Sequence, residues 1–240
     1  RTHSKLFRDI WKYEPATGEF TAAQSKGYKN GQARIVYDTK NDLIIRAPAY
    51  GGEWSARHNK KRTWIYDPNT NKWTGKPTKQ MPRYAGQCGF VYEPNLGKCV
   101  YLGFDKKGGP TTAWTYDAKT NTWEKLNCDG DAPPSRVYPA VAWDPHNKVV
   151  LLYGGIGQPS KGYGYAHRGG GSVLDDTWAL DVAAGKWTKL SVGAPVRPKL
   201  PGESKNRPRF ILRQSADYDT KLGAFVVAAP TFGVWALRYR

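Results

Sequence analysis

The 240-residue sequence has no long apolar run, few cysteines and few acidic residues. No stretch of roughly eighteen apolar residues occurs, so no transmembrane helix is predicted. The three cysteines, Cys88, Cys99 and Cys128, have no metal-ligand spacing, and at most one internal disulfide can form. Walker loops, HExxH helices, GxSxG turns and Asn-x-Ser/Thr acceptors are all missing. We therefore predict no metal and no cofactor.

The sequence is rich in basic, aromatic and turn-forming residues. Its 37 lysines and arginines outnumber its 20 acidic residues, which gives a formal charge of +17 and favours an anionic partner. The 26 glycines, 17 prolines, ten tryptophans and 15 tyrosines indicate many turns and short strands rather than long helices. A chain of this length can bury a substantial core.

One short motif recurs along the chain without a gap. Each copy has Trp at its second position and Trp or Phe nine residues later, with an acid three residues after the first Trp. Gly or Asn precedes the second aromatic by two, where a turn with positive φ is expected. The copies are IWKYEPATGEF (10–20), TWIYDPNTNKW (63–73), AWTYDAKTNTW (113–123) and TWALDVAAGKW (177–187), and a fifth begins at Val234.

A second motif alternates with the first and consists of an aromatic, an acid, a short turn and an apolar strand. Its copies are VYDTKNDLIIRAP (36–48), VYEPNLGKCVYLG (91–103), AWDPHNKVVLLYGG (142–155) and DYDTKLGAFVVAAP (217–230). The first tryptophans are 53, 50, 64 and 57 residues apart, a period of four short strands that is typical of a propeller blade. We predict that the acids cap the turns and that the tryptophans pack one blade against the next.

The order of features around these motifs resembles the kelch repeat. Apolar strands end in Gly51-Gly52 and Gly154-Gly155, then come an aromatic and a Trp, and then Pro82-Arg83 or Pro134-Ser135-Arg136 before the next strand. The last blade lacks its Gly-Gly, and the pair Gly108-Gly109 is displaced. The resemblance covers essentially the whole chain and implies an all-β propeller of four-stranded blades, such as galactose oxidase also has. It leaves the activity open.

The chain is predicted to be a single propeller domain over residues 1–240, with about four and a half to five blades. The expected units are a partial blade 1–33, blades 34–87, 88–136 and 137–209, and a partial blade 210–240. Both partial blades contain a third strand, so pairing of the termini leaves one strand too many. Either one blade of a five-bladed ring is irregular, or other sequence or another chain completes a larger or split ring.

The charge is predicted to gather on one face. Because neighbouring strands are antiparallel, the tight turns lie on one face and the long loops on the other. The long-loop segments sum to +16 of the chain's +17, and a loop face on a rigid scaffold is where binding is expected. The alternative is that these lysines and arginines only solubilise the loops. The binding candidates are Arg57, Lys60, Lys61, Arg62, Arg83, Arg136, Lys161, Arg168, Arg207 and Arg209.

Two of the four histidines lie beside arginine in these loops, within EWSARHNKKR and GYGYAHRGGG. The catalytic candidates are His58, His167, Tyr163 and Tyr165. Such residues could run a β-elimination on an acidic sugar, with Arg neutralising the carboxylate, His or Tyr removing a proton, and Tyr protonating the leaving oxygen. The alternative is that these loops pack or bind a protein. A copper site of the galactose-oxidase kind is not indicated, since no set of ligands can be identified.

Two functions are therefore carried forward. The first is a non-catalytic binding or scaffolding module that docks an acidic protein surface or an anionic glycan. The alternative is a polysaccharide lyase acting on uronate-containing polymers. Nucleic acid is a less favoured partner, because most aromatic residues occupy repeat positions and are expected in the blade core. We expect a secreted, periplasmic or cell-surface location, more often bacterial.

Overall fold

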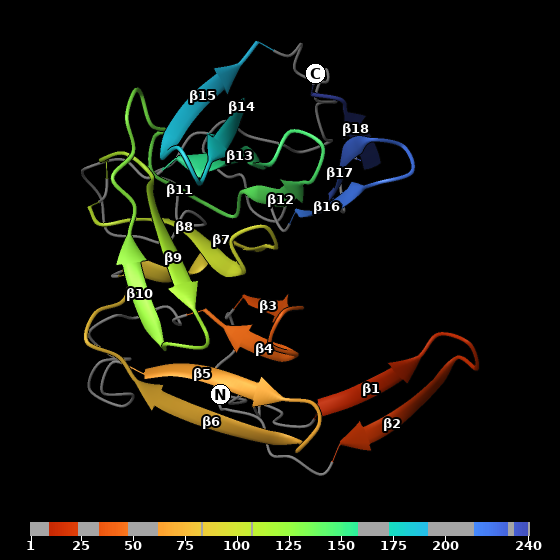
Figure 1. The fold of residues 1–240 in the computed structure, drawn as a ribbon. Coiled ribbons are helices and arrows are strands. Elements are labelled where there is room, and N and C mark those ends of the chain that lie inside the picture. Colours follow the sequence, from red (N-terminus) through yellow and green to blue (C-terminus); the bar gives the residue numbers. More distant parts are fainter. Residues whose placement is uncertain are drawn as a thin grey trace, which may run out of the picture.

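The computed structural model describes residues 10–23, 34–47, 62–82, 84–106, 108–157, 173–191, 214–229 and 233–239 (Figure 1). Within these ranges the chain is all-β and contains no helix, as predicted. The bounds of the first ten strands are β1 (Ile10–Glu14), β2 (Glu19–Ala23), β3 (Ile35–Asp38), β4 (Leu43–Arg46), β5 (Arg62–Asp67), β6 (Lys72–Pro77), β7 (Tyr84–Glu93), β8 (Lys98–Phe104), β9 (Thr112–Asp117) and β10 (Thr122–Lys125). The remaining strands are β11 (Arg136–Val137), β12 (Ala140–Asp144), β13 (Val149–Gly157), β14 (Val173–Asp181), β15 (Lys186–Leu190), β16 (Ser215–Asp219), β17 (Ala224–Ala229) and β18 (Gly233–Leu237).

These strands form five antiparallel sheets that follow one another in chain order. Blade 1 is β1–β2, blade 2 is β3–β4–β5–β6, and blade 3 is β7–β8–β9–β10. Blade 4 is β12–β13–β14–β15, with β11 paired to the end of β13, and blade 5 is β16–β17–β18. The first strands β3, β7, β12 and β16 contact one another in turn, so they lie on the inside of the arc of blades that Figure 1 shows.

The short turns are capped by the acids of the repeat, as predicted. Asp67 Oδ1, for example, accepts hydrogen bonds from the backbone N–H of Asn69 at 2.8 Å and of Thr70 at 3.3 Å. The same caps are made by Asp38, Glu93, Asp117, Asp144 and Asp219. The predicted left-handed positions are confirmed at Gly18 (φ 73°), Asn71 (55°), Asn121 (57°) and Gly185 (62°). Local chemistry therefore closes each hairpin.

The core lies between the blades rather than within one of them. Three apolar clusters join blade 2 to blade 3, blade 3 to blade 4, and blade 4 to blade 5. Trp123 is 1% exposed, and its indole Nε1 donates to Thr63 Oγ1 of the preceding blade at 2.7 Å. Trp178 and Trp187 are likewise buried in the cluster between blades 3 and 4. The prediction that the repeated tryptophans pack blade against blade is confirmed at these positions.

The first strand of blade 4 is interrupted, which the repeat did not predict. Tyr138, at φ 57°, and Pro139 separate β11 from β12. On its other side, β13 shifts register against β14 between Tyr153 and Gly155. Gly155 has a φ of 100°, and a Cβ there would lie 2.7 Å from the Val137 carbonyl oxygen. The Gly-Gly pair of blade 4 is thus needed for the close approach of β11 to β13.

Blades 1 and 5 are incomplete in the part of the chain that the structure describes. There, β1 pairs only with β2, and β18 pairs only with β17. β18 is the third strand of its sheet, and β1 has the same sequence motif as β18. Within the described residues the arc is therefore open between these two blades.

Candidate functional site

Most of the predicted site residues lie outside the described residues. These are the four catalytic candidates, His58, His167, Tyr163 and Tyr165, and the basic candidates Arg57, Lys60, Lys61, Arg83, Lys161, Arg168, Arg207 and Arg209. Arg62 and Arg136 are described. Arg62 begins β5, is half-buried, and its Nη1 donates to the Gly75 carbonyl of β6 at 2.9 Å. It therefore lies at the blade end where the segment 48–61 joins.

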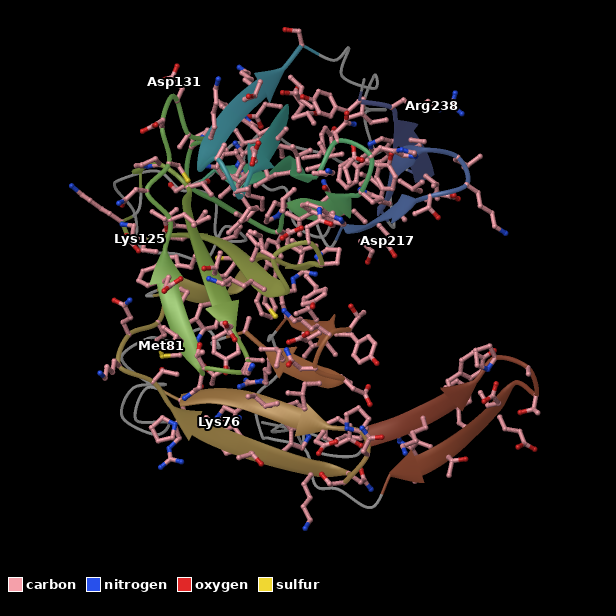
Figure 2. The ribbon with its side chains drawn as sticks, in the orientation of Figure 1. Lys76, Met81, Lys125, Asp131, Asp217 and Arg238 are labelled. Carbon is pink, nitrogen blue, oxygen red and sulfur yellow. The ribbon has the colours of Figure 1, made fainter. Side chains whose placement is uncertain are left out.

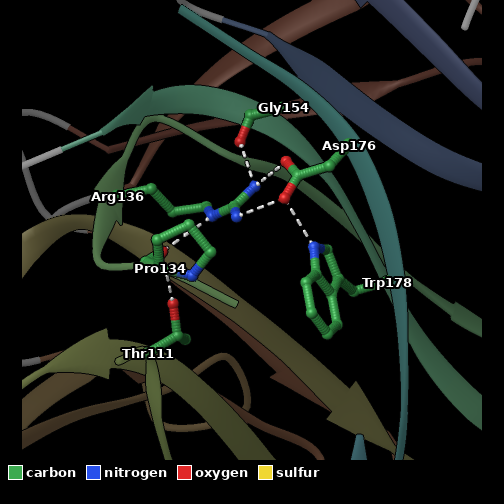
Figure 3. Close-up of polar contacts among 6 residues, drawn as sticks. All are labelled: Thr111, Pro134, Arg136, Gly154, Asp176 and Trp178. Carbon is green, nitrogen blue, oxygen red and sulfur yellow. Dashed lines mark hydrogen bonds and ion pairs between the residues drawn. The ribbon is translucent and has the colours of Figure 1, made fainter. Parts of the chain in front are cut away.

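Arg136 is buried inside blade 4 (Figure 3). Its Nη1 and Nη2 donate to the two carboxylate oxygens of Asp176 at 2.6 and 2.9 Å. Nη1 also donates to the Gly154 carbonyl at 3.0 Å, and Nε donates to the Pro134 carbonyl at 3.1 Å. The guanidinium thus ties β11 to β13 and β14. With its side chain 1% exposed, it cannot reach a partner, which corrects the assignment of Arg136 to the exposed basic surface.

Asp176 is held ionised by its neighbours. Burial alone would raise the pKa of its carboxyl, but hydrogen bonds from Arg136 and from the Trp178 indole, at 2.6 Å, lower the pKa below its usual value. A bidentate contact of this kind fixes both partners in one geometry. The charge of Arg136 is therefore used to hold the blade together.

A second polar cluster lies at the inner end of the blades, where the long segments join. Arg34 precedes β3, Cys88 lies in β7, and Tyr138 lies between β11 and β12, so three neighbouring blades contribute. Burial lowers the pKa of Arg34, while the nearby Cys88 and Tyr138 act in the opposite direction. Arginine stays charged despite such shifts. Among the described residues no carboxylate forms an ion pair with Arg34. The cluster thus contains a half-buried cation that has no counter-ion within the described ranges.

Cys88 is also hydrogen-bonded to the phenol of Tyr101, which is 1% exposed. Burial, with Cys88 as a smaller cause, raises the pKa of Tyr101 well above its usual value, so this phenol stays neutral. Gln214 occupies the corresponding place in blade 5 and is 5% exposed, and its Oε1 has no hydrogen-bond partner among the described residues. The inner ends of the blades therefore carry polar side chains in a largely apolar setting.

The sequence analysis missed this inner cluster, although the repeat contains a signal for it. Arg34 precedes the turn acid of its motif by four residues, and Cys88 and Gln214 precede theirs by five. Arg34 and Gln214 lie directly before the first strands β3 and β16, whereas Cys88 lies within β7. The repeated motifs begin at the aromatic residue and therefore do not include these three positions.

The described scaffold is almost neutral. It contains 18 of the 37 basic residues and 17 of the 20 acidic ones, so nearly all of the +17 charge belongs to segments outside it. Figure 2 shows both signs around the scaffold, with Asp131 and Asp217 as well as Lys76 and Lys125 at its margin. The largest of these segments, 48–61, 158–172 and 192–213, all join strands at the ends opposite the tight turns.

The described residues contain neither a membrane-spanning helix nor a cluster of metal ligands. No helix there is long and apolar enough to cross a membrane. No three His, Cys, Asp or Glu side chains in those residues cluster as a metal site requires. All three cysteines are free thiols in the structure.

The chain is similar to known proteins over most of its length. The family model described as the KLHDC2/KLHL20/DRC7 Kelch-repeats domain matches residues 1–204. Kelch-like protein 25 of Xenopus tropicalis is 27% identical over 158 residues, which are 64% of this chain, and the chain spans about a quarter (24%) of that protein. The solved structure of YjhT matches 96% of this chain and 72% of its own, with a TM-score of 0.63 and 16% identity, a likeness that concerns the fold. The repeated hairpins, the interblade tryptophans and the family match over most of the chain show that it belongs to the kelch-repeat family of β-propellers.

Proposed function

We propose that this protein is a non-catalytic docking module that binds an acidic protein surface at the face where its long segments join the blades. Kelch-repeat domains are typically protein-binding scaffold modules, and the chain belongs to that family. The observation that carries the proposal is the separation of charge. The described strands and tight turns are nearly neutral, and the largest basic segments are joined to strand ends opposite the tight turns. Charge arranged in this way steers an anionic partner to one face.

The inner cluster of Arg34, Cys88 and Tyr138 also favours docking at the face where the long segments join the blades. Arg34 lies at the blade ends from which these segments depart, and no described carboxylate neutralises it. A half-buried guanidinium favours an external carboxylate, because water no longer solvates it fully. Tyr138 and Cys88 beside it can add hydrogen bonds to such a group. We therefore assign Arg34 to the centre of the docking face.

Binding of polyglutamate, a model acidic polypeptide, tests the proposal. We expect affinity to fall steeply as salt rises, because screening weakens contacts between exposed charges. A Lys60→Glu/Lys61→Glu variant should bind at least tenfold more weakly. The matched control is Lys119→Glu/Lys148→Glu, which changes the net charge equally in two exposed positions of the tight turns. This control should bind within about twofold of the parent, since its lysines lie on the opposite face.

The control decides between a docking face and a bulk charge effect. If both double variants lose the same affinity, only net charge matters and the proposed face is wrong. Arg34→Gln should weaken binding while leaving the urea unfolding midpoint near that of the parent. An unchanged affinity in this variant would remove Arg34 from the face.

A parallel experiment with polygalacturonate distinguishes the proposed protein docking from glycan binding and from lyase activity. Tighter binding to this polymer than to polyglutamate would favour an anionic glycan as the partner. Release of an unsaturated product, followed by its absorbance, would show the lyase, and His58→Ala/His167→Ala should then abolish it. We expect neither result. An extracytoplasmic location remains part of the proposal.

A further inference from the structure

The segment between β10 and β11 contains the one Asp-Gly pair of the sequence, Asp129–Gly130. Both residues are exposed, and Figure 2 shows Asp131, which follows them, at the margin of the molecule. An aspartate side chain can react with the backbone nitrogen of the next residue. This reaction is least hindered where the next residue is glycine, because glycine has no Cβ.

The chain is anchored on both sides of this pair. Before it, the Leu126 N–H donates to the Ala113 carbonyl at 2.9 Å. After it, the Pro133 carbonyl accepts a hydrogen bond from the Thr111 N–H at 2.6 Å. Gly130 forms a bend between these two contacts, so the pair lies at the surface of a segment that is otherwise held in place.

The two groups that would react are free within the described part of the chain. There, the Asp129 carboxylate has neither a hydrogen bond nor an ion pair, and the Gly130 N–H has no acceptor. The turn aspartates differ, as Asp117 shows, because its carboxylate accepts hydrogen bonds from the N–H groups of Lys119 at 2.8 Å and Thr120 at 3.1 Å. At Asp129 the two reacting groups are therefore neighbours without competing partners.

The same pair connects the segment to the outer strand of blade 4. The Asp129 N–H donates to the Gly185 carbonyl at 2.8 Å, and Asp129 forms a bridge with Lys186 at the start of β15. The Trp187 carbonyl oxygen lies 3.8 Å from the place that a Cβ of Gly130 would take. The contact between blades 3 and 4 therefore depends here on an ordinary main chain at residues 129 and 130.

We propose that Asp129–Gly130 is a site of spontaneous isoaspartate formation, and that this modification loosens the contact of the segment with β15. The Gly130 nitrogen attacks Cγ of the neutral Asp129 side chain and forms a C–N bond, and the carboxyl hydroxyl leaves with the proton of that nitrogen as water. Water then adds to the main-chain carbonyl carbon of Asp129 in the cyclic imide and breaks its bond to the nitrogen, which takes up a proton. No oxidant or reductant is consumed.

The product changes the main chain rather than a side chain. The chain now runs through Cβ and Cγ of residue 129, which lengthens it by one methylene group, and the α-carboxylate becomes free. The hydrogen bond to Gly185 and the bridge to Lys186 both depend on the original spacing. This end of β15 should therefore open locally more often. The inference does not depend on the proposed acidic partner.

Ageing of the full chain for weeks at body temperature and mildly acidic pH tests the modification. The tryptic peptide LNCDGDAPPSR (126–136) contains both Asp129 and Asp131, so the exposed Asp131 is a matched control in the same fragment. Electron-transfer fragmentation distinguishes isoaspartate from aspartate. It should find at least about tenfold more isoaspartate at Asp129, because the Cβ of Ala132 hinders the attack by Asp131. Equal amounts at both positions, or none at Asp129, overturn the proposal.

Asp129→Glu is the matched variant, since it keeps the charge but forms the corresponding larger ring far more slowly. Isoaspartyl methyltransferase with labelled S-adenosylmethionine should methylate peptide 126–136 of the aged parent and leave that of the aged variant unlabelled. Label in the peptide of Asn30–Gly31, which lies outside the described residues, is counted separately because asparagine also yields isoaspartate.

Hydrogen exchange of the same samples tests the structural consequence. Residues 186 and 187 should exchange several-fold faster in the aged parent than in the fresh parent, and the aged Asp129→Glu variant should not change. Isoaspartate at position 129 without faster exchange there would overturn the proposed loosening. Faster exchange in the aged variant as well would overturn it too, because the cause would then lie elsewhere in the chain.

Discussion

Arg136 shows how a single residue in a basic sequence can be used for the fold alone. Its guanidinium has four hydrogen bonds, two to the Asp176 carboxylate and one each to the carbonyls of Gly154 and Pro134, and the side chain is 1% exposed. The exposed pair of Lys98 and Glu124, by contrast, has one contact of 3.1 Å with side chains 30% and 58% exposed. Both pairs look alike in the sequence, but only the first holds strands together.

Replacement of Asp176 by Asn should therefore destabilise the protein strongly. The variant leaves the buried charge of Arg136 without its counter-ion, and breaking a buried pair in this way costs about 3 kcal/mol or more. Urea unfolding measures the loss. Glu124→Gln is the control and should cost at most about 1 kcal/mol, because its pair is exposed to water. Equal losses in the two variants would show that the Arg136 contact is no stronger than a surface pair.

The same carboxylate predicts how stability depends on pH. Because the pKa of Asp176 is lower in the folded chain, its ionised form stabilises the protein above its unfolded pKa of about 3.9, and this contribution disappears as pH falls through the folded value. The difference in unfolding free energy between the parent and Asp176→Asn should thus be constant above about pH 5 and shrink below about pH 4. Urea titrations at several pH values measure it. A difference that does not change down to about pH 2 would contradict the assigned shift.

At the residue scale, the sequence predicted roles that depend on neighbours along the chain. The turn acids and left-handed positions were found because their partners lie two to five residues away. The burial of Arg136 was not found, because it depends on Asp176, 40 residues later. The inner cluster of Arg34, Cys88 and Tyr138 was missed for the same reason, since each member comes from a different blade.

At the scale of the element, the tight turn is the unit that repeats most faithfully. Four turns use Gly at the left-handed position, namely Gly18, Gly97, Gly185 and Gly223, whereas others use Asn or Asp. In Asn71 and Asn121 the side chain also accepts a hydrogen bond from the tyrosine five residues earlier, which offsets the strain of the backbone. Lys148 is the exception, with a φ of 56° and a side chain that cannot form such a bond.

Lys148→Gly should accordingly stabilise the protein by up to about 1 kcal/mol, because glycine adopts this conformation without a clashing Cβ. Thermal or urea unfolding measures the gain. Gly185→Ala is the converse change, since Gly185 has a φ of 62° and a Cβ there would lie 2.6 Å from the Asn127 carbonyl oxygen. It should destabilise by more than about 1 kcal/mol. A loss of stability in Lys148→Gly would mean that the lysine side chain contributes more than the strain it causes.

The blade hairpins could be predicted as elements because they have a period and a local code. The break between β11 and β12 could not, because it follows from the approach of Val137 to Gly155 across the sheet. The start of β7 at Tyr84, four residues before the expected blade boundary, likewise reflects its long pairing with β8 and a register shift in that ladder. Such irregular strand boundaries arise from contacts across the sheet that differ from blade to blade, so the features shared by the repeats do not predict them.

At the scale of the whole molecule, the repeat correctly predicted a propeller of four-stranded blades, whereas the exact division into blades and the gathering of charge on one face stay predictions. Neither pattern specifies an occupant for the basic face or for the open ends. The exposed fractions of equivalent residues show only which side chains lack a covering neighbour. Phe20 is 66% exposed and its equivalent Trp123 is 1% exposed, so the difference between them measures a missing neighbour rather than a different residue type.

The open arc also predicts a gradient of local stability along the chain. Residues of β13, such as Leu151 and Leu152, are 0% exposed and lie between neighbouring blades, whereas β1 pairs with one described strand and leaves Tyr13 55% exposed. Hydrogen exchange in dilute solution should therefore be orders of magnitude faster in β1 than in β13, since β1 opens locally and β13 opens with the whole molecule. The strand β9 occupies the same place in its blade as β1 and is the matched control. It should exchange slowly, because blades on both sides cover it. Equal protection of β1 and β9 would mean that β1 is covered as fully as β9, which would contradict the predicted gradient.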